Sequence, residues 1–434
     1  MPDAALGDAV PDGYRRTVSY RAGVAVSSWP GRRHACFASR VRDLVVQLMS
    51  GSAPWDAVAE VDAGLPGAPA GLRITGQVRE HAPGDAVITT TVEYPESGPE
   101  AGEAGRACRA GGADRAGRAD GADRAGGADR ADGVSGADTA AGNGGYVGVT
   151  RVTATRDSGV TAIAGGHAVR ITGCRELTLL TRVEAFRDAE GIGAARARAL
   201  TAVATAPAGE PRLLLAEHAR AHASAFGDVA LDLGAAAADR GLPVGELLAR
   251  QAARPDQPLP ALLEKLFDSG RYLLLSASGL LPSRLTGLWQ GDWNPAWSGA
   301  ITTDANLGLQ LAGAVTTDVP TAVYNADAAC ALPGVLTEML VDSVPADESG
   351  PGRIELLPAV PDFLPTGRLR GARTLAGVRV AELRWDAVAG QAEAVLLSAA
   401  DREADVSCRG SAPRRRVTLP AGTPVRMTWE HGGG

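Results

Sequence analysis

The side chains best suited to bind a polar ligand are gathered in residues 287–311. The 434-residue chain has seven tryptophans, and three of them occur in this stretch among acids and amides: Trp289, Asp292, Trp293, Asn294, Trp297 and Asn306. An indole ring packs its flat face against the C–H face of a sugar, while amides and carboxylates bond to the sugar hydroxyl groups. The stretch therefore indicates a carbohydrate pocket. On composition alone, a loop whose tryptophans fill a core is the alternative.

The residues before this stretch have the 3.6-residue apolar period of helices. Residues 213–226, LLLAEHARAHASAF, predict one helix. A second helix continues through RYLLLSAS to the breakers Gly279 and Pro282, and its apolar face is predicted to consist of Leu259, Leu262, Leu263, Leu266, Phe267 and Gly270. These two helices must position the tryptophan-rich stretch.

Two histidines of the first helix have the spacing of metal ligands. His218 and His222 are four residues apart, but the chain has no HExxH pattern there and no third ligand nearby. We therefore predict an ordinary polar helix face, with no metal site and no cofactor.

Both ends of the chain have strand patterns. Short alternating runs rich in β-branched residues, broken by Gly and Pro, predict an N-terminal β-sandwich over residues 14–183. A linker rich in Ala and Gly follows at 184–212, then a helical domain at 213–345. Strand patterns return in a C-terminal β domain at 346–434. The order β, α, β predicts a multidomain α and β protein that ends in a second β-sandwich.

Residues 101–144 interrupt the N-terminal strands with a low-complexity sequence of Gly, Ala, Asp and Arg, in which GADR recurs. A segment with almost no apolar side chain larger than alanine cannot offset its ordering entropy by burial. We predict a disordered insertion in a hairpin loop.

The overall composition limits the classes of partner. The formal net charge is −7, with one lysine, Lys265, which gives no basic surface for nucleic acid or anionic lipid. The five cysteines are scattered, so neither a disulfide framework nor a zinc site is indicated. The N-terminus lacks a signal peptide and no long apolar run follows, which predicts a cytoplasmic protein, or a secreted one if the true start lies upstream.

Several phrases together resemble glycoside hydrolase family 95, the α-L-fucosidase family. The most specific is GRYLLLSASGLLPSRLTGLWQGDWNPAWSGAITTDANLGLQ at 270–310; YRR at 14–16, HARAHASAFGDVALDLG at 218–234 and TEMLVDS at 337–343 also match. The resemblance implies an N-terminal β-sandwich, an (α/α)6 barrel that holds the site, and a C-terminal β domain. It also implies inverting hydrolysis of terminal α-linked L-fucose or a related sugar, with a fucosylated oligosaccharide or glycan as the partner.

The resemblance also implies roles for particular residues. Asn306 matches the asparagine that positions the attacking water, and Asp327, in YNADAACALPGVLTEML, matches the aspartate that activates it. Asp304 replaces a second asparagine, which exchanges a donor-acceptor amide for an acceptor and predicts a changed sugar preference or a weakened site. The residues expected to bind substrate are Trp289, Trp297 and Asn294. For Asp327 alone, a helix N-cap is the structural alternative.

The family's acid is a glutamate, and this chain has none between Glu264 and Glu338. Residues 213–345 number 133, whereas twelve helices with their loops need roughly 180–200. We therefore expect an internally truncated, incomplete barrel and little or no fucosidase activity. Either the gene has lost an internal segment, or the reading frame omits residues that the protein has. A non-catalytic carbohydrate-binding or vestigial protein is the alternative function.

Overall fold

The computed structural model describes residues 11–64, 67–68, 71–94, 144–277, 327–347, 350–409 and 414–430. The chain forms two compact units. The first comprises Met1–Arg15 and Ser27–Pro211, and the second comprises Arg16–Val26 and Arg212–Gly434.

The first unit is built on one antiparallel sheet. Its strands are β3 (Arg32–Ala38), β4 (Val45–Glu60), β5 (Arg73–Ala82), β6 (Asp85–Glu93), β7 (Gly145–Ala154), β8 (Gly159–Ala162) and β9 (Ala168–Phe186). They are ordered β3-β4-β9-β7-β6-β5, and β8 pairs with β9. One half of β9 pairs with β7 and the other with β8, while β4 runs along both halves through two register shifts.

The apolar core of the first unit gives a physical reason for the strand pattern that predicted a sandwich. Ile171 from one half of β9 and Leu179 from the other share a core with Ile88 of β6 and Val152 of β7. The bent sheet therefore encloses apolar side chains much as two facing sheets do. The strand predicted to resume after the low-complexity sequence is confirmed as β7, while residues 101–143 lie outside the described residues.

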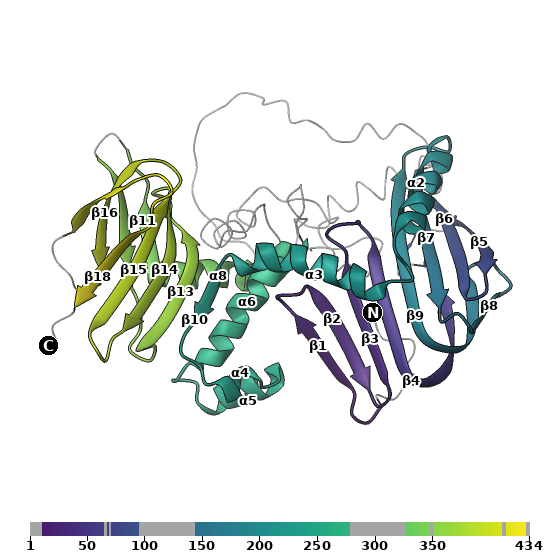
Figure 1. Cartoon of the computed structure of the whole chain (residues 1–434), viewed down its shortest axis with the longest axis horizontal. Helices are drawn as coiled ribbons and strands as arrows, with labels where there is room; N and C mark the ends of the chain where they lie inside the picture. Colours follow the sequence, from purple (N-terminus) through teal and green to yellow (C-terminus); the bar gives the residue numbers. More distant parts are fainter. Residues whose placement is uncertain are drawn as a thin grey trace, which may run out of the picture. The chain divides into compact units, whose positions relative to one another are not determined.

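The segment expected to be a linker contains a helix. Helix α2 (Gly191–Thr205) lies against β7 and β9 (Figure 1). Its buried residues are Ala195, Ala199 and Val203, at a spacing of four, so small side chains at helical period form the contact. Alanine has the highest helix propensity. An alanine-rich sequence is therefore as compatible with a helix as with a flexible linker.

The second unit begins with a hairpin and a set of helices. The hairpin joins β1 (Arg15–Ser19) to β2 (Val24–Trp29). The helices and the strand among them are α3 (Pro211–Gly227), β10 (Ala230–Asp232), α4 (Ala237–Arg240), α5 (Val244–Ala253), α6 (Pro260–Ala277) and α8 (Asp327–Leu340). Both predicted helices are confirmed, as α3 and α6. These described helices do not by themselves trace a barrel, so the (α/α)6 architecture stays a prediction.

The second unit ends in a sandwich of two sheets (Figure 1). The five-stranded sheet runs β10, β13 (Thr366–Arg373), β14 (Val378–Asp386), β15 (Gln391–Ser398) and β18 (Val425–Glu430). The four-stranded sheet runs β11 (Val341–Val344), β12 (Gly352–Leu356), β16 (Arg402–Cys408) and β17 (Arg415–Leu419).

The core of the sandwich extends to the helices. Leu383 of one sheet and Val406 of the other are fully buried in it, together with Phe267 of α6 and Leu336 of α8. The C-terminal sandwich and the helices before it are therefore joined by one hydrophobic core. The domain boundaries predicted from the sequence, at residues 183, 212 and 345, stay predictions.

No helix in the described part of the chain is both long and apolar enough to cross a membrane.

Candidate functional site

A fully buried arginine joins α6 to the end of α3. Arg271 has an exposed fraction of 0%, and its Nη1 donates to the carbonyl oxygens of Phe226 at 2.7 Å and Val229 at 2.9 Å. Its guanidinium carbon lies 5.0 Å from the centre of the Phe226 ring. The last carbonyls of a helix have no intrahelical partner, and a cation there is favoured by the helix dipole. Arg271 therefore fixes the GRY phrase of α6 against α3.

Two buried histidines join α3 to the hairpin. His218 Nε2 lies 3.0 Å from the carbonyl oxygen of Gly23, and His222 Nε2 lies 2.9 Å from that of Tyr20. Both histidines are 2% exposed, so the prediction of an ordinary polar helix face is wrong. A neutral imidazole can donate from one nitrogen, and here the acceptors for such bonds are the carbonyls of a turn. No group of three or more His, Cys, Asp or Glu able to hold a metal occurs among the described residues.

Glycine is required in this turn. Gly23 has a φ of +67°, and a Cβ built on it would lie 2.8 Å from His222 Cγ and 2.9 Å from His218 Nε2. Tyr20 of the same turn lies 5.2 Å from Tyr272 of α6 between ring centres. The hairpin therefore contacts both helices that carry the family phrases.

The buried carboxylate of Glu264 in α6 forms hydrogen bonds to the segment between β10 and α4. Glu264 accepts from the backbone N–H of Leu233 at 2.7 Å and from Arg240 Nε and Nη2 at 2.7 and 2.9 Å. Its two carboxylate oxygens hold the segment between β10 and α4 in place, and Glu264 raises the pKa of Arg240. Both oxygens of this carboxylate are therefore engaged in charge-assisted bonds that hold the backbone.

Asp268 of α6 has a raised pKa. Burial raises its pKa to about 6, and the positive charge of Arg271 acts in the opposite direction. Glu264 raises this pKa further and Lys265 lowers it. A carboxyl group of this kind can hold a proton at mildly acidic pH, as general acids do.

The residues predicted from the sequence to form the site are not placed by the structure. Trp289, Asn294, Trp297, Asp304 and Asn306 all lie outside the described residues. Asp327 is the first residue of α8, and its side chain is also outside the description. The structure thus describes helices that precede and follow this stretch in the sequence, and it does not test the predicted contacts.

Sequence reasoning missed the polar residues of α6. It placed Leu266 on the apolar face, yet Leu266 is 40% exposed, while Glu264 and Arg271 are buried. The spacing of Glu264, Asp268 and Arg271, four and then three residues, is the signal that could have found them, because it places all three on one helix face.

The sequence match defines the class of protein. Residues 211–320 match the family model of the Glycosyl hydrolase family 95 catalytic domain. This range begins with α3, includes α6 and extends over the tryptophan-rich stretch. Over this segment, about a quarter of its length, the chain is similar to the catalytic domain of glycoside hydrolase family 95.

The curated relatives are fucosidases that match over short segments. "Probable alpha-fucosidase A" of Aspergillus niger is 45% identical over 76 residues, which are 17% of this chain and 9% of that protein. "Probable alpha-fucosidase A" of Aspergillus oryzae is 32% identical over 117 residues, 26% and 16% of the two chains. "Alpha-L-fucosidase 2" of Arabidopsis thaliana is 44% identical over 54 residues, 12% and 6%. The matches therefore span under a fifth of the length of each relative.

Proposed function

We propose that this protein is a glycoside hydrolase homologue of the inverting α-L-fucosidase type, with a site for terminal α-linked L-fucose or a related sugar. The observation that carries the proposal is the family match over 211–320, because that range contains the candidate sugar-binding residues. The named activities of the relatives support fucose as the sugar. The packing of α3, α6 and the hairpin supports a rigid base for the site.

In this proposal, Trp289 and Trp297 pack on the sugar ring and Asn294 bonds to its hydroxyl groups. Asn306 accepts a hydrogen bond from the attacking water, and Asp327 polarises the pair, which orients the water toward the anomeric carbon. Inversion also requires an acid on the opposite face to protonate the leaving oxygen. Asp304, as an acceptor where the family has an amide, would disfavour a substrate oxygen that needs a donor.

The acid is the part that we propose is missing. No glutamate occurs between Glu264 and Glu338, and Glu264 is bonded to Arg240 and to backbone N–H groups. We therefore propose a truncated catalytic domain with impaired hydrolysis. The same observations favour a second candidate, a non-catalytic protein that binds the sugar without cleaving it.

Hydrolysis of p-nitrophenyl α-L-fucoside tests the proposed impairment. We expect the full chain to release p-nitrophenol no faster than its Asn306→Ala variant. Release well above that variant would contradict the proposed impairment while supporting the fucosidase site. A sugar-protection measurement completes the test: L-fucose should raise the midpoint of thermal unfolding of the wild-type chain and not that of Asn306→Ala.

A further inference from the structure

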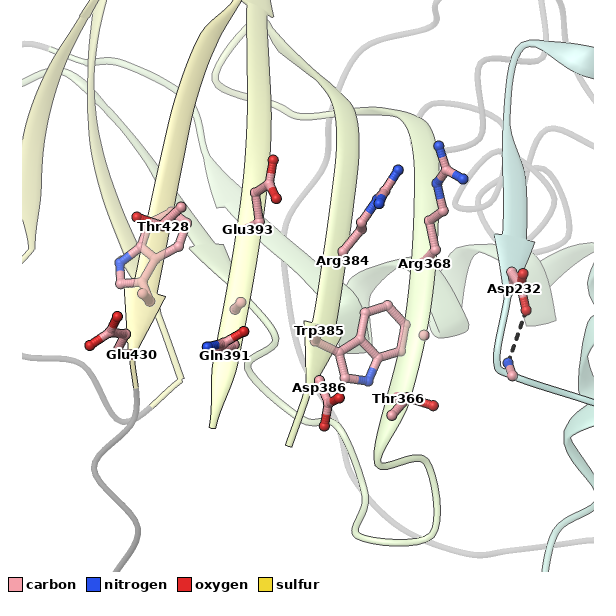
Figure 2. A pocket seen from close by; sticks show the side chains of 14 residues that line it. Asp232, Thr366, Arg368, Arg384, Trp385, Asp386, Gln391, Glu393, Thr428 and Glu430 are labelled. Atoms are coloured by element: carbon pink, nitrogen blue, oxygen red, sulfur yellow. Dashed lines mark hydrogen bonds between the residues drawn. The ribbon is translucent and has the colours of Figure 1, made fainter. Parts of the chain in front are cut away.

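An open groove of about 620 Å³ lies on the C-terminal five-stranded sheet. Figure 2 shows its lining, in which Arg368, Arg384 and Glu393 follow one another across neighbouring strands above Thr366, Asp386, Gln391 and Glu430. Its volume is within the range of about 300–1,000 Å³ that is usual for ligand pockets.

Strand register arranges the lining side chains in two rows. One row consists of Asp232, Arg368, Arg384, Glu393 and Thr428. The other consists of Thr366, Asp386, Gln391 and Glu430. Side chains two residues apart on a strand share a face, so both rows are on the outer face. The residues between them, Trp385, Ala392 and Trp429, belong to the buried core, which makes the floor of the groove rigid.

The charges on this face are largely compensated within the sheet. The ion pairs are Arg368–Glu382, Arg384–Glu382, Asp232–Arg240 and Glu393–Arg426. The Asp386 carboxylate accepts from the backbone N–H of Ala389 at 2.8 Å. The bond from a neutral N–H leaves the charge of Asp386 in place, so the named groups leave no positive field to attract a nucleic acid or a polyanionic glycan.

The groove nevertheless keeps many groups that can form hydrogen bonds. A paired guanidinium has five N–H donors, a carboxylate has several lone pairs, and the amide of Gln391 and the hydroxyls of Thr366 and Thr428 both donate and accept. Neutral ligands that alternate donors and acceptors along their length match such a surface. Strands β13 to β18 are three strand spacings apart, or roughly 14 Å, which is long enough for a short chain of sugar rings.

We infer that this groove is a second carbohydrate site, which binds a neutral oligosaccharide on the C-terminal sandwich. It does not depend on the proposed fucose site, which lies on a separate stretch of the chain. Binding at this groove would hold the protein on a glycan while the proposed fucose site recognises the terminal sugar of the same glycan.

Isothermal titration of the full chain tests this inference. The neutral probes are cellotetraose, mannotetraose and an unfucosylated xyloglucan heptasaccharide, and the charged probes are tetragalacturonate and tetralysine. At least one neutral probe should bind with a Kd of about 1 mM or lower. The double variant Gln391→Ala/Glu430→Ala removes two exposed cross-strand neighbours from the groove and should weaken that binding about tenfold or more.

Two controls make the outcome specific. Glu403→Ala/Thr418→Ala removes a similar cross-strand pair from β16 and β17, away from the groove, and should leave the affinity unchanged. Asn306→Ala should also leave it unchanged, so a defective fucose site cannot imitate a defective groove. The inference is overturned if no neutral probe binds, if tetragalacturonate or tetralysine binds more tightly than they do, or if the groove variant binds as well as the control.

Discussion

Arg271 of α6 donates to the carbonyl oxygen of Phe226 at 2.7 Å while its guanidinium carbon lies 5.0 Å from the centre of the same residue's ring. One side chain thus bonds to the backbone and covers the aromatic ring of the last turn of α3. The contact is buried and joins two helices that both belong to the family 95 segment. It ties together two helices that precede the candidate site residues in the sequence.

Loss of this arginine should destabilise the second unit. Arg271→Met keeps most of the apolar volume but leaves the carbonyls of Phe226 and Val229 without this donor, which should lower the free energy of unfolding by about 2–4 kcal/mol. Arg220→Met changes an exposed arginine on α3 and should cost no more than about 0.5 kcal/mol. Urea unfolding followed by circular dichroism measures both, and equal costs would refute the role given to Arg271.

Substitution of Gly23 should show that the hairpin is held by the histidines. Gly23→Ala places a methyl group against His218 and His222 at a positive φ. Gly422 has a similar φ, +69°, but open space around it, so Gly422→Ala carries only the backbone strain, about 1 kcal/mol. We expect Gly23→Ala to cost about 1–2 kcal/mol more than Gly422→Ala. The thermal unfolding midpoints of the two variants provide the comparison, and equal midpoints would mean that the histidines do not confine the turn.

The raised pKa of Asp268 should make stability depend on pH. The ordinary pKa of an aspartate side chain, 3.8, applies to the unfolded chain, whereas the pKa of Asp268 in the folded chain is about 6. The folded state therefore binds more protons between these two values. This contribution to stability is fully present below about pH 4 and is lost as pH rises through 6. Its full size, from below pH 4 to well above pH 6, is about 3 kcal/mol.

Asp268→Asn removes this titratable group, so its free energy of unfolding should lack the fall between pH 4 and pH 7 that Asp268 causes in the wild type. Over that interval the variant should therefore gain about 2 kcal/mol of stability relative to the wild type. Asp256→Asn, in the exposed loop before α6, serves as the control and should follow the wild-type pH profile. Urea unfolding at pH 4, 5, 6 and 7 gives the profiles. If Asp268→Asn keeps the wild-type slope, Asp268 is not the group that titrates.

Helices α3 and α6 were predictable because their apolar residues recur at the spacing of an α-helix. Leucines at helical spacing predicted α3 and α6. Strand β13 has a less distinct pattern, because its outward residues, Arg368 and Arg370, belong to a polar face, and its buried residues are few and small apart from Leu369. The pattern of such a strand is weak, and its partners on β14 decide its conformation.

The polar contacts of the site region were less predictable, because they depend on tertiary partners. His218 and His222 bond to carbonyls of a turn that lie 195 and 202 residues earlier in the sequence, and no local pattern identifies such a partner. The burial of Arg271 similarly depends on Phe226, which lies on another helix. The family phrases, by contrast, were recognisable from the sequence because they are specific runs of residue types, and the family match over 211–320 bears out those at 218–234 and 270–310.

Calorimetric titration of the full chain with L-fucose is the decisive measurement for the proposed site. The proposal is that the chain retains a fucose site whose water-positioning residues are Asn306, in the segment that matches family 95, and Asp327, which follows that segment. We expect heat to be released on binding by the wild-type chain, and we expect Asn306→Ala and Asp327→Ala each to weaken this binding about tenfold or more. Absence of binding by a folded wild-type chain, or equal binding by all three proteins, would contradict it.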